Sequence, residues 1–286
     1  MSIVAEKPQE RLKASEAFWK GRKYEVAPVS PRITRIKELR AEHDNGNVIL
    51  CAERTKIYTD YYKSHEDELP ILKRAGALYD WCAKKLVRLE KDEMFVGNIG
   101  TDWRSAHPYV EWGVWWIQDA LDLPREDWIR EWQSPGVFAY VSPEDEQVYR
   151  EAVEYWKDRC IQAHSHSAWP DEVWDLLGDG CTSLGARGRK FTADMPAGHY
   201  CANHRKVIEV GWGGIREEAE GHIQALMGKV FGDDARRFTF WRAMKKVAEG
   251  AILLTNRYAE LVHAAWENEP EGERKDELKM MAEGLA

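Results

Sequence analysis

The dipeptide Gly198-His199 is the strongest candidate for chemistry in this sequence. It lies between a strand-like entry that begins at Phe191 and an amphipathic helical pattern that extends to Leu226. Loops at such junctions are where the side chains of α/β proteins most often meet a ligand. The residue pattern leaves two interpretations of His199 open. One is a ligand contact, and the more common one is a surface or capping residue that fixes the loop.

Two groups of histidines are candidates for metal binding. His164 and His166 stand close together, but no carboxylate or further histidine follows at ligand spacing. His199 and His204 flank Cys201, and this spacing fits none of the usual zinc ligand sets. We therefore predict a solvated loop for the first pair and no metal ligand at either place.

The sequence assigns no nucleophile and no phosphate-binding loop. A G-x-S-x-G motif does not occur, and the glycine-rich stretches 178–190 and 211–214 match neither nucleotide-binding pattern. We expect Gly213 and Gly214 to permit close helix packing. An odd, dispersed set of cysteines without a C-x-x-C predicts free structural thiols. These are Cys51, Cys82, Cys160, Cys181 and Cys201.

Composition narrows the classes of partner. The chain has 286 residues and a net charge of -8, with acidic and basic residues interleaved and no basic stripe, so we expect no nucleic-acid partner. No apolar run is long enough to cross a membrane. Residues 1–20 are polar, predict a flexible N-terminus and lack the apolar core of a signal peptide, so we expect a cytoplasmic protein.

The apolar periodicity predicts a mainly α fold with a few strands. Ser30-Pro31 and Ser142-Pro143 are typical helix starts, with serine as the cap and proline in the first turn. Helical patterns also cover 48–63, 69–88, a segment ending at Asp119, 142 to about 159, two long stripes within 208–230 and 241–265, and a final helix from Lys275.

An apolar run and a loop follow the second of these helices. Residues 94–96 predict a short strand, and glycine and asparagine at 97–100 break it into a loop. The loop carries three ionisable side chains: Asp102, Arg104 and His107.

Four blocks of sequence, in this order, resemble the N-terminal part of the glycyl radical enzymes, the pyruvate formate-lyase-like family. The likeness is greatest to its dehydratase and lyase branches, such as glycerol dehydratase, choline trimethylamine-lyase and hydroxyproline dehydratase, rather than to pyruvate formate-lyase (formate acetyltransferase) itself. The blocks are AERTKIYTDYYKSHEDELPILKRAGAL, DEMFVGNIGTDWRSAHPYVEW, FTADMPAGHYCANHRKVIEVGWGGIREEAE and AILLTNRYAELVHAAWENEPEGERKDELKMMAE.

The resemblance implies a fold and a domain organisation. Residues 21–286 are expected to form the N-terminal part of a pyruvate formate-lyase-like domain whose C-terminal remainder is absent from the sequence. The helices would be outer helices of the family's ten-stranded α/β barrel, which is built from two half-barrels around an internal active site.

The resemblance also implies a chemistry. Members of the family carry a glycyl radical on a C-terminal loop and a cysteine on a finger loop, and a radical S-adenosylmethionine activating enzyme installs the radical. We expect a parent enzyme of anaerobic metabolism, homodimeric when full length, that eliminates a leaving group from a small polar substrate. The sequence has no R-V-x-G-Y-type glycine motif and no cysteine in the family's finger-loop context. No catalytic residue can therefore be transferred, no cofactor is expected to be bound, and the chain alone is expected to be inactive.

One substrate-binding residue can be transferred from the resemblance. The histidine of the G-H loop reaches the substrate pocket in the glycerol dehydratase branch, and Gly198-His199 matches it in position. This favours a substrate contact for His199 over a purely structural role. The alternative function, of a different class, is a non-catalytic helical scaffold or partner protein from a truncated or split gene.

Overall fold

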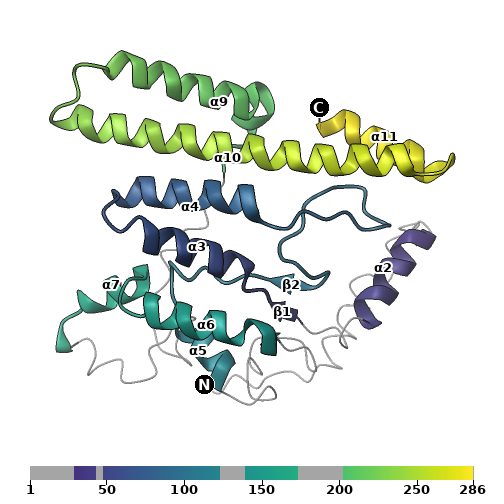
Figure 1. Cartoon of the computed structure of the whole chain (residues 1–286), viewed down its shortest axis with the longest axis horizontal. Coiled ribbons are helices and arrows are strands. Elements are labelled where there is room, and N and C mark those ends of the chain that lie inside the picture. The colour runs from purple at the N-terminus through teal and green to yellow at the C-terminus, as the bar shows by residue number, and fades with distance from the viewer. Residues whose placement is uncertain (1–28, 43–47, 123–138, 173–201, 286) are drawn as a thin grey trace, which may run out of the picture. The chain divides into compact units, whose positions relative to one another are not determined.

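The computed structural model describes residues 29–42, 48–122, 139–172 and 202–285, in two units that divide after Leu39 (Figure 1). The expected flexible segment 1–20 lies outside the described residues. Helix α2 (Pro31–Glu42) begins where Ser30-Pro31 predicted a start. The backbone N–H of Ile33 donates to Ser30 Oγ across 3.3 Å, which confirms Ser30 as the cap.

A small parallel sheet is the only sheet in the described part of the chain. Strand β1 (Val48–Leu50) lies between β2 (Ser105–Ala106) and β3 (Ala139–Val141) in the order β2-β1-β3. Ile49 pairs with Ser105 on one side and with Tyr140 on the other. The predicted helix over 48–63 is therefore wrong in its first residues, because two β-branched residues of β1 have a partner strand on each side.

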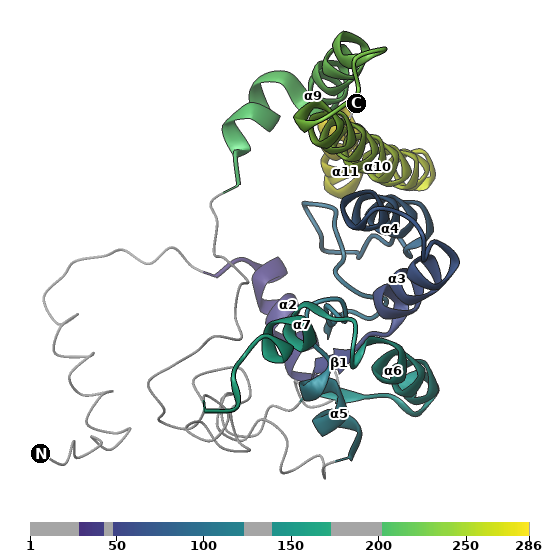
Figure 2. The same cartoon turned by 90° about the vertical axis from the view of Figure 1, so that its left-hand side faces the viewer.

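Helices α3 (Glu53–Ser64) and α4 (Pro70–Lys84) follow β1 and pack on each other. α4 also packs on α10, and both Figure 1 and Figure 2 show α4 between α3 and α10. The helix predicted over 69–88 is confirmed over Pro70–Lys84, and Ala75 and Cys82 lie on its buried face. At Gly250 of α10 a Cβ atom would lie 3.1 Å from Tyr79 Cα, so the absence of a side chain permits this close approach.

Three helices surround the main apolar cluster. They are α5 (Trp115–Asp122), α6 (Pro143–Trp156) and α7 (Ile161–Ser167). Ser142 caps α6 by accepting the N–H of Asp145, as predicted, and Asp145 Oδ2 in turn accepts the N–H of Ala52 at the start of α3. The cluster consists of Leu50, Ala52, Val110, Val114, Ile117, Tyr149, Ala152, Trp156 and Cys160.

The last third of the described chain is helical, as the stripes predicted. It comprises α9 (His204–Leu226), α10 (Asp233–Asn268) and α11 (Glu273–Leu285), with α10 packed on both neighbours. Gly211 has φ of +65°, and the first turns of α9 bend away from the rest there (Figure 2). Gly213 has no neighbour within 4 Å of a Cβ position, so the expected close packing at this glycine is wrong.

Residues 94–96 do not form the predicted strand. Phe95 is 89% exposed and the segment has no partner strand, whereas β2 lies ten residues later in the sequence. An apolar run without a pairing edge gains no strand hydrogen bonds, which explains the error. None of the described helices is both long and apolar enough to span a bilayer.

Candidate functional site

His199, the predicted substrate contact, lies outside the described residues, as do Cys181 and Cys201. The helix that follows the G-H loop is described from its cap onward. Asn203 Oδ1 accepts the N–H of Lys206 across 3.1 Å and starts α9 at His204. A helix is therefore present where the sequence pattern predicted one, and the role of His199 stays a prediction.

The second candidate from the sequence, the loop that carries Asp102, Arg104 and His107, lies within the described residues between α4 and β2. The side chain of Asn98 organises this loop. The Asn98 amide donates to the carbonyls of Leu86 and Gly100 across 2.9 and 2.8 Å. The N–H of Asn98 donates to the Tyr258 hydroxyl across 3.0 Å, and that hydroxyl donates to Asn98 Oδ1. One buried asparagine therefore joins the start of the loop at Leu86 to the turn at Gly100 and attaches both to α10.

Lys85 lies beside this asparagine and is only 2% exposed. Its Nζ donates to the Asn98 carbonyl and, across 3.4 Å, to the Tyr258 hydroxyl, and it lies 4.9 Å from the centre of the Trp81 ring. Burial lowers the pKa of Lys85, although the charge of Glu53 opposes the shift. A buried amine with a lowered pKa is the kind of group that can serve as a base. Here its hydrogen bonds are to groups of the protein itself, so its observed role is to hold the loop.

His107 of the same loop is half-buried against aromatic rings. Its Nδ1–H donates to the Ile99 carbonyl across 3.0 Å, and its ring packs edge-on against Trp81 and Tyr109. Burial, followed by the charge of Arg54, lowers the pKa of His107 to about 4. The imidazole is therefore neutral at neutral pH and can accept a further hydrogen bond at Nε2. Asp102 accepts the N–H of Trp103 and so stabilises the turn.

A buried ion pair lies next to this loop. Arg54 of α3 donates to both carboxylate oxygens of Glu111, across 3.0 and 2.6 Å, and both side chains are 6% exposed. The guanidinium also lies over the rings of Tyr58 and Tyr109, at 3.7 and 4.2 Å from their centres. Burial disfavours the guanidinium, but the hydrogen bond and charge of Glu111 outweigh this, so the pKa of Arg54 is raised.

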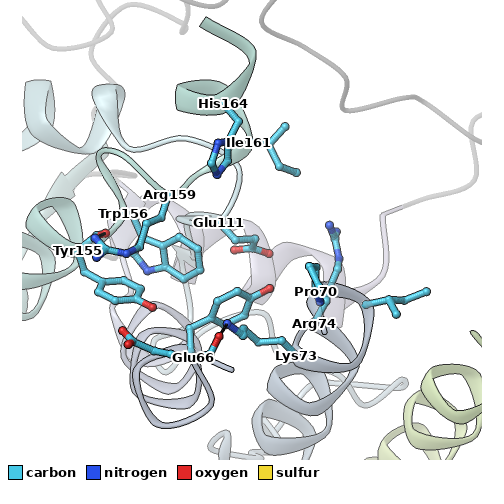
Figure 3. A pocket seen from close by; sticks show the side chains of 12 residues that line it. Glu66, Pro70, Lys73, Arg74, Glu111, Tyr155, Trp156, Arg159, Ile161 and His164 are labelled. Atoms are coloured by element: carbon cyan, nitrogen blue, oxygen red, sulfur yellow. Dashed lines mark hydrogen bonds between the residues drawn. The ribbon is translucent and has the colours of Figure 1, made fainter. Parts of the chain in front are cut away.

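Glu111 forms the inner end of a pocket of about 670 Å³. Tyr155 and Trp156 line one side, Pro70 and Arg74 line the other, and Ile161 and His164 complete the rim (Figure 3). The remaining lining residues are Tyr62, Glu66, Ile71, Lys73 and Arg159. The pocket thus combines an apolar, aromatic lining with several cationic side chains.

Neither reactive thiols nor a metal centre occur among the residues that the structure describes. Cys51, Cys82 and Cys160 are buried and free, and burial raises the pKa of the Cys82 and Cys160 thiols, which disfavours the thiolate. His164 and His166 lie in α7 rather than in the predicted loop, since Cys160 Sγ accepts the N–H of Ala163 and caps that helix. No group of three or more metal-binding side chains is present in the described ranges.

Sequence reasoning missed the groups that the fold brings together here. Arg54 and Glu111 are 57 positions apart, and Lys85 and Tyr258 are 173 apart, so no local pattern links either pair. The available signal was a charged residue within an apolar helix face. Arg54 sits one helical turn before Tyr58, and Lys85 directly follows the buried face of α4.

Comparison with known proteins identifies the family. Residues 20–286 match the family model described as "Pyruvate formate lyase-like". The chain belongs to this family. The expected resemblance is therefore confirmed, and the helices and loop described above are those of a pyruvate formate lyase-like protein.

Relatives within the family are dehydratases and lyases. The chain is 28% identical over 234 residues to the probable dehydratase YbiW of Escherichia coli, covering 82% of this chain and 27% of that protein. It is 27% identical to isethionate sulfite-lyase of Desulfovibrio desulfuricans, covering 92% and 31%. The chain therefore spans less than a third of the length of either relative.

The fold agrees with solved structures of the same group. The glycerol-bound B12-independent glycerol dehydratase of Clostridium butyricum superposes with a TM-score of 0.72 and 24% identity, over 91% of this chain and 31% of that enzyme. The observed fold, mainly helical with a small parallel sheet, is thus shared with a glycyl radical enzyme. At this identity the likeness speaks to the fold alone.

Proposed function

We propose that this chain is the N-terminal portion of a glycyl radical enzyme that eliminates a leaving group from a small polar substrate. The observation that carries the proposal is the family match over residues 20–286, together with relatives that are named dehydratases and lyases. In this proposal the described helices are outer helices of the family's ten-stranded α/β barrel. Residues 21–286 then form one part of a larger domain, preceded by the polar segment 1–20.

The chemical class of the substrate follows from the relatives. One relative is named for the cleavage of isethionate, a hydroxylated sulfonate, and another is named a dehydratase. We propose a short hydroxylated molecule that loses a hydroxyl group as water, or a sulfonate group as sulfite, on elimination. A histidine in the substrate pocket suits such a molecule, because its ring N–H can donate to a hydroxyl or a sulfonate oxygen and an unprotonated ring nitrogen can accept from a hydroxyl.

His199 is the residue proposed for that contact. Support comes from its place in the Gly198-His199 loop, immediately before a helix that the structure describes from its Asn203 cap.

The radical chemistry would be supplied by the family's glycyl radical, installed by a radical S-adenosylmethionine activating enzyme. The cysteines of this chain do not fit a radical relay, because none stands in the family's finger-loop context, and the sequence holds no radical-glycine motif. The proposal therefore gives this chain the tasks of folding and substrate contact, and predicts that it forms no glycyl radical when it is isolated. In the same proposal the intact protein is a cytoplasmic homodimer.

The first test follows the reading frame beyond the codon for Ala286. A frame that continues into a cysteine finger loop and a radical-glycine motif supports the enzyme. A stop codon with no complementary frame nearby would favour the rival function, a helical scaffold or partner protein.

The second test measures chemistry. The protein expressed from the full frame is treated anaerobically with its activating enzyme and offered isethionate, glycerol and propane-1,2-diol. We expect a glycyl radical signal by electron paramagnetic resonance and turnover of one substrate class, with no signal from residues 1–286 alone. His199→Ala should raise KM or lower kcat by about tenfold or more, since a lost hydrogen bond to substrate costs about 1.5 kcal/mol or more. His204→Ala, at an exposed position, is the matched control. Unchanged kinetics in His199→Ala would refute the substrate contact.

A further inference from the structure

The pocket that ends at Glu111 has a lining that suits a particular class of ligand. From this lining we propose that it binds a small organic anion with a flat apolar body, such as an aromatic carboxylate, sulfonate or phosphate. This proposal is independent of the function proposed above, because it uses only residues of α3, α4, α6, α7 and the segments beside them.

The charge of the pocket is positive once its ion pairs are assigned. The Glu111 carboxylate is held by Arg54 and is neutralised by it. Three cationic residues remain: Lys73, Arg74 and Arg159. The opposing carboxylate in the lining is that of Glu66. This local excess of positive charge stands in a chain of net charge -8, so it is not a consequence of composition.

The three cationic side chains keep hydrogen-bonding capacity for a ligand. Arg74 makes no hydrogen bond or ion pair with any residue in the described ranges. Lys73 Nζ donates to the Glu66 carbonyl across 2.8 Å, and Arg159 donates to the Tyr155 carbonyl across 2.9 Å. Neither of these two forms an ion pair within the described part of the chain. An anion in the pocket would therefore meet cations whose charge is not already compensated.

The apolar lining is rigid and largely aromatic. The rings of Tyr62 and Trp156 lie 4.7 Å apart at an interplanar angle of 56°, and Trp156 is buried. Its Nε1–H donates to Thr59 Oγ1 across 2.9 Å, which fixes the indole. The Tyr155 ring stands edge-on to the same indole at 5.3 Å. Fixed rings offer faces and edges to a flat ligand without a large entropic cost of ordering them.

The size and charge of the pocket disfavour an inorganic anion and a metal cation as occupants. A volume of about 670 Å³ is within the range of small-molecule pockets and exceeds what an inorganic anion fills. Metal cations are disfavoured by the surplus of positive side chains. The phenol of Tyr62 remains a neutral donor, because burial raises its pKa to about 12, and so it does not repel an anion.

The test uses 2-naphthoate as the probe, with the 286-residue chain and the intrinsic fluorescence of its tryptophans as the readout. We expect saturable binding of 2-naphthoate that weakens as salt is raised. The neutral isostere 2-naphthamide should bind at least tenfold more weakly, and inorganic phosphate should compete only at far higher concentration.

Variants at the rim separate this proposal from non-specific binding. Arg74→Gln should weaken 2-naphthoate binding at least fivefold, and its unchanged circular dichroism and Tm would show that the fold is intact. Lys84→Gln is the control, since Lys84 is on the same helix but is paired with Asp80 and does not line the pocket. Equal affinity for 2-naphthamide, or no effect of Arg74→Gln, would overturn the proposal. Binding of a hexaglutamate peptide without binding of 2-naphthoate would overturn it too and would assign the surface to an acidic protein segment.

Discussion

Arg54 and Glu111 form a two-point ion pair that joins α3 to the segment before α5, and both side chains are almost fully buried. Removing one partner of such a pair leaves a charge in the interior without compensation. We expect Arg54→Met to lower the free energy of unfolding by about 3–5 kcal/mol. Equilibrium urea unfolding monitored by circular dichroism measures this.

Two further variants test the cause of that loss. The double variant Arg54→Met/Glu111→Leu should recover most of it, because no buried charge then remains. Lys56→Met is the control, since the Lys56–Asp60 pair on the same helix is exposed and is expected to contribute about 0–1 kcal/mol. A single variant as stable as the wild type would show that the pair does not stabilise the fold.

Removal of the Tyr258 hydroxyl is expected to lower the free energy of unfolding. This hydroxyl accepts the N–H of Asn98 and a proton of Lys85 Nζ, and it donates to Asn98 Oδ1. Tyr258→Phe leaves the buried Asn98 N–H without its partner and removes one of the hydrogen bonds of Lys85 Nζ and of Asn98 Oδ1, so we expect a loss of about 2 kcal/mol. Hydrogen exchange should show faster exchange of the Asn98 amide. In Tyr61→Phe, where the hydroxyl donates to the part-exposed Glu68 across 3.3 Å, we expect a loss below about 0.5 kcal/mol.

Glycines within the long helices give a matched comparison. In Gly250→Ala the new methyl group meets Tyr79 Cα at 3.1 Å, and the backbone of α4 cannot move aside as a side chain would. Gly221, in α9, has no neighbour within 4 Å of its Cβ position. Gly221→Ala should stabilise by about 0.5–1 kcal/mol through helix propensity. Gly250→Ala should be about 1–3 kcal/mol less stable than Gly221→Ala, and equal Tm values would count against a tight α4–α10 contact.

His107 makes stability depend on pH. Its pKa falls from the ordinary value of 6.5 to about 4 in the folded chain, first through burial and then through the charge of Arg54. Between these values the unfolded chain binds a proton that the folded chain does not, so stability present above pH 6.5 is lost as pH falls toward 4.

His107 changes the free energy of unfolding by at most about 1.4 kcal/mol per pH unit. Urea unfolding at pH 7 and pH 4.5 should show a smaller acid loss for His107→Gln than for the wild type. An NMR titration of His107 with a midpoint near 6.5 would contradict the prediction.

Local chemistry explains which parts of the fold the sequence predicted. Ser30 and Ser142 start helices through hydrogen bonds to residues three positions away, and a local pattern contains that information. The strand predicted at 94–96 failed because strands need partners from elsewhere in the chain. Residues 48–50 became a strand for the same reason, since both of their partners lie more than 50 positions away.

The candidate site also has features that the sequence predicted and features that it could not predict. The free thiols Cys51, Cys82 and Cys160 were predicted from spacing and are confirmed. His164 and His166 were expected in a loop, but Cys160 caps a helix there through its sulfur, a role that sequence statistics rarely assign to cysteine. The pocket at Glu111 could not be predicted, because its lining comes from segments that only packing brings together.

The hydrogen bonds between Asn98 and Tyr258 have a consequence for synthesis on the ribosome. The two residues are 160 positions apart, so the loop around Asn98 is made long before its partner exists. At about 5–20 residues per second, this interval lasts on the order of 8–32 s. During that time the Asn98 N–H lacks its partner, and Lys85 and Asn98 can bind only water and groups of their own loop. The nascent chain must therefore keep its first half soluble without the hydrogen bonds to Tyr258, which is a task for chaperones.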